Sequence, residues 1–402
     1  MSSKAATWPL VQLGGVIRQR KEFIEIDDLQ TYKRARVQLH AKGIVLRDIV
    51  EGSLVKTKRQ QVSRAGEFLV AEIDAKVGGF GMVPDDLDGA IVSSHYFLFQ
   101  IDETKLERRF LDFFIRTPSF RDQVEAQGST NYAAIRPAHV LGYQIPLPPL
   151  SEQRRIVARI ETLAAEIAEA KRLRQEAVAE AEAISQKQLD VSMTPHGSGW
   201  TRETVADVVE SMDAGWSPQC DEIPASENEW GVLKTTSVQW CDFQPQYNKR
   251  LPATFAPRPE LAVKKGDVLV TRAGPRKRVA VVAAVRDDFP KLTISDKLIR
   301  LHVVESKVEP RFLELSLCSP FSQEHLVQRK TGLADAQVNI SQSILKATPF
   351  AYPPLPEQRR IVAELDALQE QVNALKRLQS ATAAELDALL PAILDRAFKG
   401  GL

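Results

Sequence analysis

The 402-residue chain contains little cysteine and little histidine. Its three cysteines, Cys220, Cys241 and Cys318, are widely spaced and all lie in the second half. They form neither a CxxC pattern nor the dense framework of a disulfide-rich domain. The six histidines show no metal-ligand spacing with one another or with the cysteines. We therefore expect free thiols, a reducing cytoplasmic location and no metal site.

Long hydrophobic runs are also missing. The sequence has no stretch of eighteen apolar residues, and its first residues, Met1–Pro9, lack the apolar core of a signal peptide. We expect neither a transmembrane helix nor a secretory leader. The formal net charge is only +1. A neutral total does not decide whether the protein binds nucleic acid, because a basic face can be balanced by acidic helices elsewhere.

Catalytic motifs are missing as well. The chain has no GxxxxGK phosphate loop, no HExxH and no GxSxG. The glycine-rich segment Gly78–Gly81 lacks the strand-turn-helix context that a dinucleotide site requires. Glu72, Asp74 and Lys76 imitate a nuclease triad, but charges at a strand edge are far commoner. The sequence therefore predicts neither an active site nor a cofactor in this chain.

What the sequence does contain is a repeat. Pro148–Ala158 returns as Pro353–Ala363 with ten of eleven residues identical, at an offset of 205 positions. The offset grows along the chain from 192 to 205, as expected if loops differ in length on a shared scaffold. The chain is therefore a duplication of a module followed by a long helix. Further matching pairs are Trp8 and Trp200, Gly66–Val70 and Gly266–Val270, and Phe110–Leu111 and Phe312–Leu313.

Each module is predicted to be mixed β and α, with strands first and helices later. Short β-branched or aromatic runs bounded by turn residues indicate strands. Helical segments are expected near 104–126 and 309–330, each broken before a proline that starts a second helix, Pro118 or Pro320. The expected strands are Gly43–Leu46, Glu67–Val70 and Ile91–Phe99 in the first module, and Gly231–Leu233, Asp267–Val270, Val279–Val282 and Leu298–Leu301 in the second.

Both long helices carry a coiled-coil seam, in which the core-facing positions recur in steps of four and three. Each seam has one polar step at the same place, Arg174 or Gln379. The two seams most simply pack on each other within one chain, although each can instead pair with another protomer or partner. The predicted seams are Ile156, Ile160, Leu163, Ile167, Ala170, Arg174, Ala177, Ala181 and Ile184, and Ile361, Leu365, Leu368, Val372, Leu375, Gln379, Thr382, Leu386 and Leu389.

Basic residues cluster in both modules. Such clusters are usually solvated surface, but two sets on duplicated domains favour contacts with nucleic-acid phosphates. Polar segments just before each long helix, 128–132 and 332–339, carry amide and hydroxyl groups suited to base edges, or are simply polar turns. The clusters comprise Arg18, Arg20, Lys21, Lys33, Arg34, Arg36, Lys56, Lys58, Arg59 and Arg64, and Lys249, Arg250, Lys264, Lys265, Arg272, Arg276, Lys277 and Arg278.

The repeated phrase Pro-Pro-Leu-x-Glu-Gln-Arg-Arg-Ile-Val-Ala and the ending Leu389–Gly400 resemble the specificity subunit of type I restriction-modification systems. The resemblance covers essentially the whole chain. It implies an α+β fold of two duplicated mixed α/β target-recognition domains separated by two long antiparallel coiled-coil helices. Each domain is expected to read one half of an asymmetric, bipartite DNA site. The expected segments are 1–147 and 195–352 for the recognition domains, and 148–194 and 353–402 for the spacer helices.

The resemblance also implies partners. These are double-stranded DNA, two modification subunits that methylate adenine, and motor-nuclease restriction subunits. The chain itself is then a non-catalytic, cytoplasmic subunit without a cofactor and without a membrane. Two alternatives stay open: a coiled-coil scaffold with two protein-binding modules, or the specificity subunit of another DNA-modification defence system.

Two sets of site residues follow from the resemblance. The candidates for partner docking are Glu152, Gln153, Arg154, Arg155, Glu357, Gln358, Arg359 and Arg360. The candidates for DNA contact are Arg47, Lys56, Lys58, Arg59, Arg64, Ser129, Thr130, Asn131, Tyr132 and Arg136 in the first domain, and Lys234, Thr235, Thr236, Arg272, Arg276, Lys277, Arg278, Gln337 and Asn339 in the second.

Overall fold

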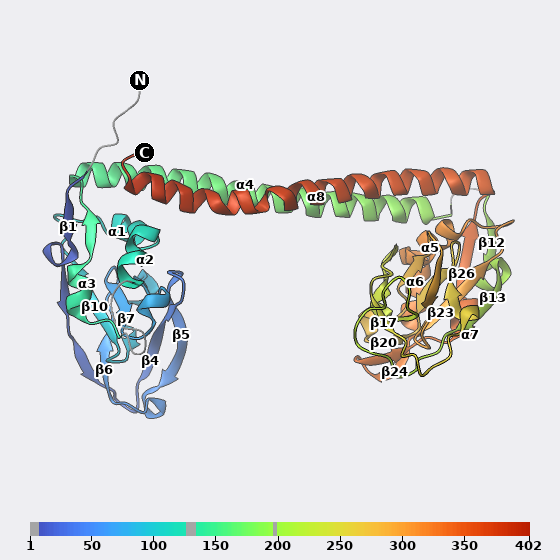
Figure 1. Ribbon diagram of the computed structural model, residues 1–402, viewed down its shortest axis with the longest axis horizontal. Helices are drawn as coiled ribbons and strands as arrows, with labels where there is room; N and C mark the ends of the chain where they lie inside the picture. Colours follow the sequence, from blue (N-terminus) through green and yellow to red (C-terminus); the bar gives the residue numbers. More distant parts are fainter. Residues whose placement is uncertain (1–7, 126–133, 196–198) are drawn as a thin grey trace, which may run out of the picture. The chain divides into compact units, whose positions relative to one another are not determined.

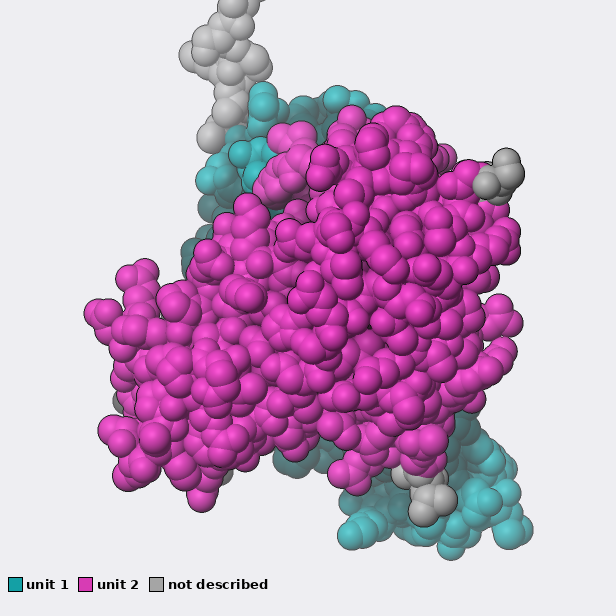
Figure 2. Space-filling view, turned by 90° about the vertical axis from the view of Figure 1, so that its right-hand side faces the viewer, with its two compact units in different colours: residues 1–175, 379–402 teal, residues 176–378 magenta. Residues whose placement is uncertain are grey.

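The computed structural model describes residues 8–125, 134–195 and 199–402. The chain forms two compact units, which Figure 2 colours separately: unit 1 is 1–175 with 379–402, and unit 2 is 176–378. The long helices α4 (Leu150–Met193) and α8 (Leu355–Phe398) each contribute to both units. Each unit therefore combines one module with a section of both helices. Among the described residues, no helix has the length and apolar character needed to cross a membrane.

The first module, blue to cyan in Figure 1, contains a four-stranded sheet of order β2-β10-β7-β8 and a five-stranded sheet of order β3-β6-β9-β4-β5. Strands β1 and β11 pair with each other. The strands are β1 Leu10–Gln12, β2 Ile17–Arg20, β3 Phe23–Glu25, β4 Thr31–Gln38, β5 Gly43–Glu51, β6 Arg59–Val62, β7 Phe68–Ala71, β8 Phe80–Met82, β9 Ile91–Val92, β10 Tyr96–Ile101 and β11 Gln144–Pro146. The helices are α1 Arg108–Phe114, α2 Pro118–Glu125 and α3 Pro137–Gly142.

The second module has sheets of order β13-β23-β19-β21, β17-β14-β22-β18 and β20-β25-β24, and the pairs β12-β26 and β15-β16. Its helices are α5 Pro310–Cys318, α6 Pro320–Gln328 and α7 Gln342–Lys346. Its strands are β12 Thr201–Thr204, β13 Val209–Ala214, β14 Gly231–Leu233, β15 Val238–Gln239, β16 Asp242–Phe243, β17 Asn248–Arg250, β18 Ala262–Val263, β19 Val268–Thr271, β20 Ala273–Gly274, β21 Val282–Ala284, β22 Phe289–Thr293, β23 Leu298–Val303, β24 Thr331–Ala334, β25 Gln337–Asn339 and β26 Pro349–Tyr352.

The two central sheets have the same strand order and the same antiparallel register, which confirms the duplication. Leu98 on β10 lies opposite Leu69 on β7, and Arg300 on β23 lies opposite Leu269 on β19. The broken helix pairs are present in both modules, with Pro118 and Pro320 starting α2 and α6. The strand predicted over Val279–Val282 is wrong except for its last residue. Ala280 has a φ of 66°, which takes the backbone out of strand geometry.

The long helices pair antiparallel in each unit. In unit 1, Lys171 forms a salt bridge with Asp387, and Arg174 donates to Thr382 Oγ1 at 2.6 Å. In unit 2, Lys376 forms a salt bridge with Glu182. Higher numbers on α4 meet lower numbers on α8, as the predicted fold class requires. Arg174, the polar step of its seam, also donates to the backbone carbonyl of Gln379, the polar step of the other.

The predicted seam is wrong by one position near its end in both helices. Ile184 is 53% exposed and Leu389 is 44% exposed. Ser185 instead faces Gln369 of α8, and Leu390 packs against the core of the first module. A helix turns every 3.6 residues, so a strict 3.5-residue repeat drifts by about 20° per heptad. The inward-facing position near the end of each seam therefore lies one residue later in the sequence than predicted.

The far end of each long helix completes the core of a module. In unit 1, the ring of Phe398 lies 4.8 Å from that of Phe110 and 5.2 Å from that of Phe114. In unit 2, Met193 at the end of α4 is buried in the core that contains Phe312. Met193 and Phe398 are equivalent at the offset of 205. Each unit is thus closed by a helix that began in the other.

Candidate nucleic-acid interface

Candidate residues from three separate segments of the second module lie together. Arg278 belongs to a short 3₁₀ helix, η8 (Arg276–Arg278). Its guanidinium donates to the carbonyls of Thr235 at 2.8 Å and Val238 at 2.7 Å. It also donates to Gln239 Oε1 at 2.8 Å. Arg278 therefore ties the 276–278 loop to the segment that carries Lys234, Thr235 and Thr236.

The third segment joins through the small sheet β20-β25-β24. Asn339 on β25 pairs with Ala273 on β20. The backbone N–H of Arg276 donates to the Asp335 carbonyl at 2.8 Å, and its guanidinium pairs with the Asp335 carboxylate at 2.7 Å. We call the surface formed by 234–239, 272–278 and 335–339 the second-module cluster. It lies just after the carboxyl end of β19.

The charges in this cluster have different environments. Partial burial lowers the pKa of Arg278, and the three hydrogen bonds of its guanidinium all go to uncharged acceptors. Lys277 is exposed and makes no ion pair or hydrogen bond with the residues that the structure describes. Gln337 and Asn339 are exposed on β25. The half-buried Arg278 thus joins two of the loops, while Lys277 and the two amides face solvent.

The candidates of the first module do not gather in this way. Lys58 pairs with Asp28 and donates to the Gly52 carbonyl at 2.8 Å. The guanidinium of Arg59 stacks on the Phe23 ring at 4.5 Å. Arg64 pairs with Glu22 at 2.8 Å, just before β7 begins. Lys56 is exposed, and Arg47 lies at a bulge in the β4–β5 ladder, 3.7 Å from Asp48.

Arg136 lies at the opposite end of β7 from Arg64. Its guanidinium pairs with Glu72, the residue after β7, at 2.7 Å. The other carboxylate oxygen of Glu72 lies 2.8 Å from His95 Nδ1. Ser129, Thr130, Asn131 and Tyr132 lie outside the described residues. Sequence reasoning missed His95 and treated Glu72 only as an imitation of a nuclease triad.

The glutamine of each repeated Glu-Gln-Arg-Arg phrase is buried, with an exposed fraction of 0% for both Gln153 and Gln358. Gln153 accepts from the backbone N–H of Glu107 at 2.8 Å and donates to the Lys105 and Pro148 carbonyls, each at 2.9 Å. Gln358 makes the equivalent three bonds in the second module. These two side chains hold module to helix and offer no surface to a partner, which corrects the docking expectation for both.

The remaining docking candidates are accessible on the first turns of α4 and α8. Glu152 pairs with Arg155 at 2.8 Å, and Glu357 pairs with Arg360 at 2.6 Å. The arginine hydrogen bond lowers the pKa of each glutamate. Arg154 and Arg359 are exposed beside these pairs. Docking at these six positions stays a prediction.

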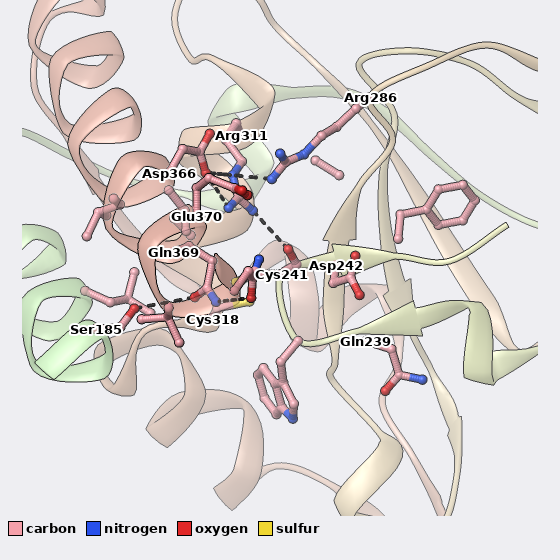
Figure 3. A pocket seen from close by; sticks show the side chains of 18 of the residues that line it. Ser185, Gln239, Cys241, Asp242, Arg286, Arg311, Cys318, Asp366, Gln369 and Glu370 are labelled. Carbon is pink, nitrogen blue, oxygen red and sulfur yellow. Dashed lines mark hydrogen bonds and ion pairs between the residues drawn. The ribbon is translucent and has the colours of Figure 1, made fainter. Parts of the chain in front are cut away.

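Unit 2 also contains a pocket of about 950 Å³, lined by α4, α8, α5 and the β15–β16 hairpin (Figure 3). At its wall, Arg311 pairs with Asp366 at 2.7 Å and with Glu314, and donates to the Cys241 carbonyl at 3.3 Å. Burial alone lowers the pKa of Arg311, but the two carboxylates outweigh it and raise the pKa.

Metal chemistry finds no support in this pocket or elsewhere in the described part of the chain. No three His, Cys, Asp or Glu side chains converge there as metal ligands. Burial raises the pKa of the Cys318 thiol, which lines the pocket together with Cys241. We therefore assign the pocket no chemistry.

Comparisons with known proteins agree with this geometry. Residues 7–177 and 236–383 match the family described as type I restriction modification DNA specificity domain. The type I restriction enzyme EcoEI specificity subunit of Escherichia coli is 41% identical over 202 residues, which are 49% of this chain and 34% of that protein. The EcoBI specificity subunit of Escherichia coli is 23% identical over 397 residues, covering 89% of this chain and 79% of that protein.

Two solved structures resemble the whole chain. The HsdS subunit from Thermoanaerobacter tengcongensis has a TM-score of 0.64 and 28% identity, with 98% of this chain and 97% of that chain covered. A chain from a structure that describes complex assembly of the type I R-M system has a TM-score of 0.73 and 28% identity, with both chains fully covered at 100%. With both modules matched in sequence and in fold, the chain belongs to the family of type I restriction-modification specificity subunits.

Proposed function

We propose that this chain reads an asymmetric, bipartite DNA site, with one half-site for each module. The observation that carries the proposal is the second-module cluster. It brings cations and amides from three distant segments onto one surface, where the half-buried Arg278 holds one segment and Arg276 holds another. The guanidinium of Arg278 spends its hydrogen bonds on joining these segments and forms no salt bridge with the residues that the structure describes.

The chemistry of the cluster suits duplex DNA. The exposed ammonium of Lys277 is available to a phosphate, and phosphate contacts set affinity and register without reading sequence. Gln337 and Asn339 present amides, which can bond the N6 and N7 edge of adenine in two places. We assign Lys277 to the backbone and the two amides to base edges.

We propose that modification and restriction subunits dock on the exposed starts of α4 and α8. The support is that Glu152, Arg154 and Arg155 have exact counterparts in Glu357, Arg359 and Arg360. Two equivalent surfaces suit two copies of one modification subunit. Methylation and cleavage then lie with those partners, and recognition lies with this chain. On this proposal, 1–147 and 195–352 are the recognition domains, and 148–194 and 353–402 are the spacers.

The test measures DNA binding of the chain co-expressed with its modification subunits. Methylation mapping of genomic DNA, with and without this chain, first identifies the split motif. Lys277→Ala should then lower the salt dependence of binding by about one phosphate contact, a change of about 0.9 in the logarithmic slope. Lys265→Ala is the matched control, because this exposed lysine lies before β19 at its opposite end.

Two outcomes contradict the proposal. If no methylation motif depends on the chain and binding shows no sequence preference, the chain does not read DNA. If Lys265→Ala changes the slope and Lys277→Ala does not, DNA lies against the other end of the sheet. If the chain is instead a scaffold that binds proteins through both modules, neither lysine substitution should change its binding to DNA.

A further inference from the structure

The first module contains a counterpart of the second-module cluster outside its predicted basic clusters. The strands β7 and β19 are equivalent, and so are the residues that follow them, Glu72 and Arg272. The carbonyl of Glu72 accepts from the backbone N–H of Ile135 at 2.8 Å. The carbonyl of Arg272 accepts from Ile340 at 2.9 Å. The same two segments therefore meet in both modules, just before the short helices α3 and α7.

The side chains at this place differ completely between the modules. In the first, the largely buried carboxylate of Glu72 bridges two exposed groups, Arg136 at 2.7 Å and His95 at 2.8 Å. The side chain of Arg136 is 64% exposed, and its guanidinium carries five N–H donors, more than its bond to Glu72 uses. In the second, Arg272 takes the place of Glu72. Under the proposed function, two surfaces with such different donors and acceptors should read different base pairs.

Three of the cations expected to read DNA in the first module are already engaged with other side chains. Lys58 is held by Asp28, Arg64 by Glu22, and Arg59 by the ring of Phe23. Arg64 precedes β7, whereas Glu72 follows it, so the two groups lie at opposite ends of the strand. Arg64 and Glu72 therefore mark two different candidate places for base contacts on this sheet.

We propose that the first module reads its half-site with Glu72, His95 and Arg136, at the carboxyl end of β7. Arg136 donates to a base edge in the major groove, where guanine N7 and O6 are the acceptors that suit a guanidinium. Glu72 is a positioning residue, because it fixes Arg136 through one oxygen and His95 through the other. This inference rests on the proposed function, since it assigns residues within the same DNA-reading role.

The arrangement has a measurable signature. The Glu72 carboxylate balances the charge of Arg136, so the pair adds little to phosphate attraction. Arg136 should therefore act on base preference and leave the salt dependence of binding nearly unchanged. Removing an arginine that contacts only phosphate should instead lower the salt dependence of binding and leave base preference unchanged.

The experiment uses the full chain with its modification subunits and duplexes that carry single base-pair changes in either half of the mapped motif. Arg136→Ala should reduce discrimination at one base pair of the first half by about ten- to a hundred-fold, the range for a bidentate contact. Discrimination in the second half and the salt slope should not change. Glu72→Gln should weaken discrimination at the same base pair, and Glu72→Asp should restore part of it.

Arg64→Ala is the control, because Arg64 also forms a salt bridge but at the opposite end of β7. The inference is overturned if Arg64→Ala changes base preference and Arg136→Ala does not, or if Arg136→Ala weakens binding equally for every sequence. The proposed function fails separately, when the unaltered complex itself shows no sequence preference. Hydrogen exchange of the first module verifies that each variant keeps its fold.

Discussion

The two modules contain the same ion-pair network in two different environments. Arg109 in the first module pairs with Asp112 and Glu161, and Arg311 in the second pairs with Glu314 and Asp366. The Arg109 side chain is 52% exposed, whereas that of Arg311 is only 10% exposed. The β15–β16 hairpin makes the difference, since its Cys241 carbonyl contacts Arg311. The same ion pairs are thus present in both modules. Their contribution to stability should differ, because the hairpin shields only the pairs of Arg311 from solvent.

In a second network, the cation that neutralises a buried acid lies on a different strand in each module. Glu67 and Asp267 are equivalent buried acids before β7 and β19. Glu67 is neutralised by Arg20 on the edge strand β2 at 2.7 Å. Asp267 lies 3.6 Å from Arg300, which is on the neighbouring strand β23 and is also paired with Asp213 on the edge strand. The buried acid thus has the same position in both modules, whereas its cation lies on the edge strand in the first and on the adjacent strand in the second.

The largest effect is expected where the helix ends close the cores. Phe398→Ala should destabilise unit 1 by about 3 to 5 kcal/mol, because it removes a buried ring that packs on Phe110 and Phe114. Met193→Ala should act on unit 2 instead. Hydrogen exchange resolved by peptide checks this, since each variant should loosen one unit only. Equal loosening of both units would show that they unfold together.

A smaller difference is expected between the two ion networks. Arg311→Ala should cost about 3 kcal/mol, the low end of the range for breaking a buried pair. Burial already raises the pKa of Glu314, so this carboxyl can take up a proton once its cation is gone. Arg109→Ala should cost under about 1 kcal/mol, as exposed pairs do. Urea unfolding of both variants measures the ratio, and equal costs would contradict the role of the hairpin.

The smallest effect concerns Tyr143, whose equivalent in the second module is Thr348. Thr348 donates to the Ile344 carbonyl at 3.1 Å, whereas the buried Tyr143 hydroxyl finds no partner among the described residues. Tyr143→Phe should therefore be neutral or stabilising by up to about 1 kcal/mol. Thr348→Val should cost about 1 kcal/mol.

Burial raises the pKa of Tyr143 to about 12, from an ordinary value of 10.0. The neutral phenol is thus favoured in the folded state. Its contribution to stability is complete below pH 10 and is lost as the pH rises from 10 to 12. Tyr143→Phe should flatten the loss of stability in that window, as measured by urea unfolding. In a phenolate absorbance titration, the folded Tyr143→Phe variant should lack one tyrosine that ionises near pH 12 in the unaltered protein.

Much of the fold was predictable because its main sequence signals occur in both halves of the chain. The repeated phrase located the starts of α4 and α8, and the paired glycines at Gly66 and Gly266 located β7 and β19. The repeat could not separate Gln153 from Arg154, because duplication copies a buried anchor and an exposed surface equally well. Only the hydrogen bonds of the folded chain distinguish them.

The candidate site was less predictable for a related reason. In the second module, runs of cations and amides happened to coincide with the place where the segments meet. In the first, the cations Lys58 and Arg64 have acidic partners that come from distant strands and loops. Arg136 is likewise paired with an acid, Glu72, across 64 positions. Local composition does not report such long-range pairing.

The division of the chain into units sets an order for folding during synthesis. Unit 2 is one continuous segment, 176–378, and can close as soon as it leaves the ribosome. Unit 1 cannot, because Leu394, Ala397 and Phe398 belong to its core and are translated after unit 2. The module made first is therefore the one finished last. A chain that stopped before Leu394 would lack part of the core of the first module, although every residue of 8–147 was present.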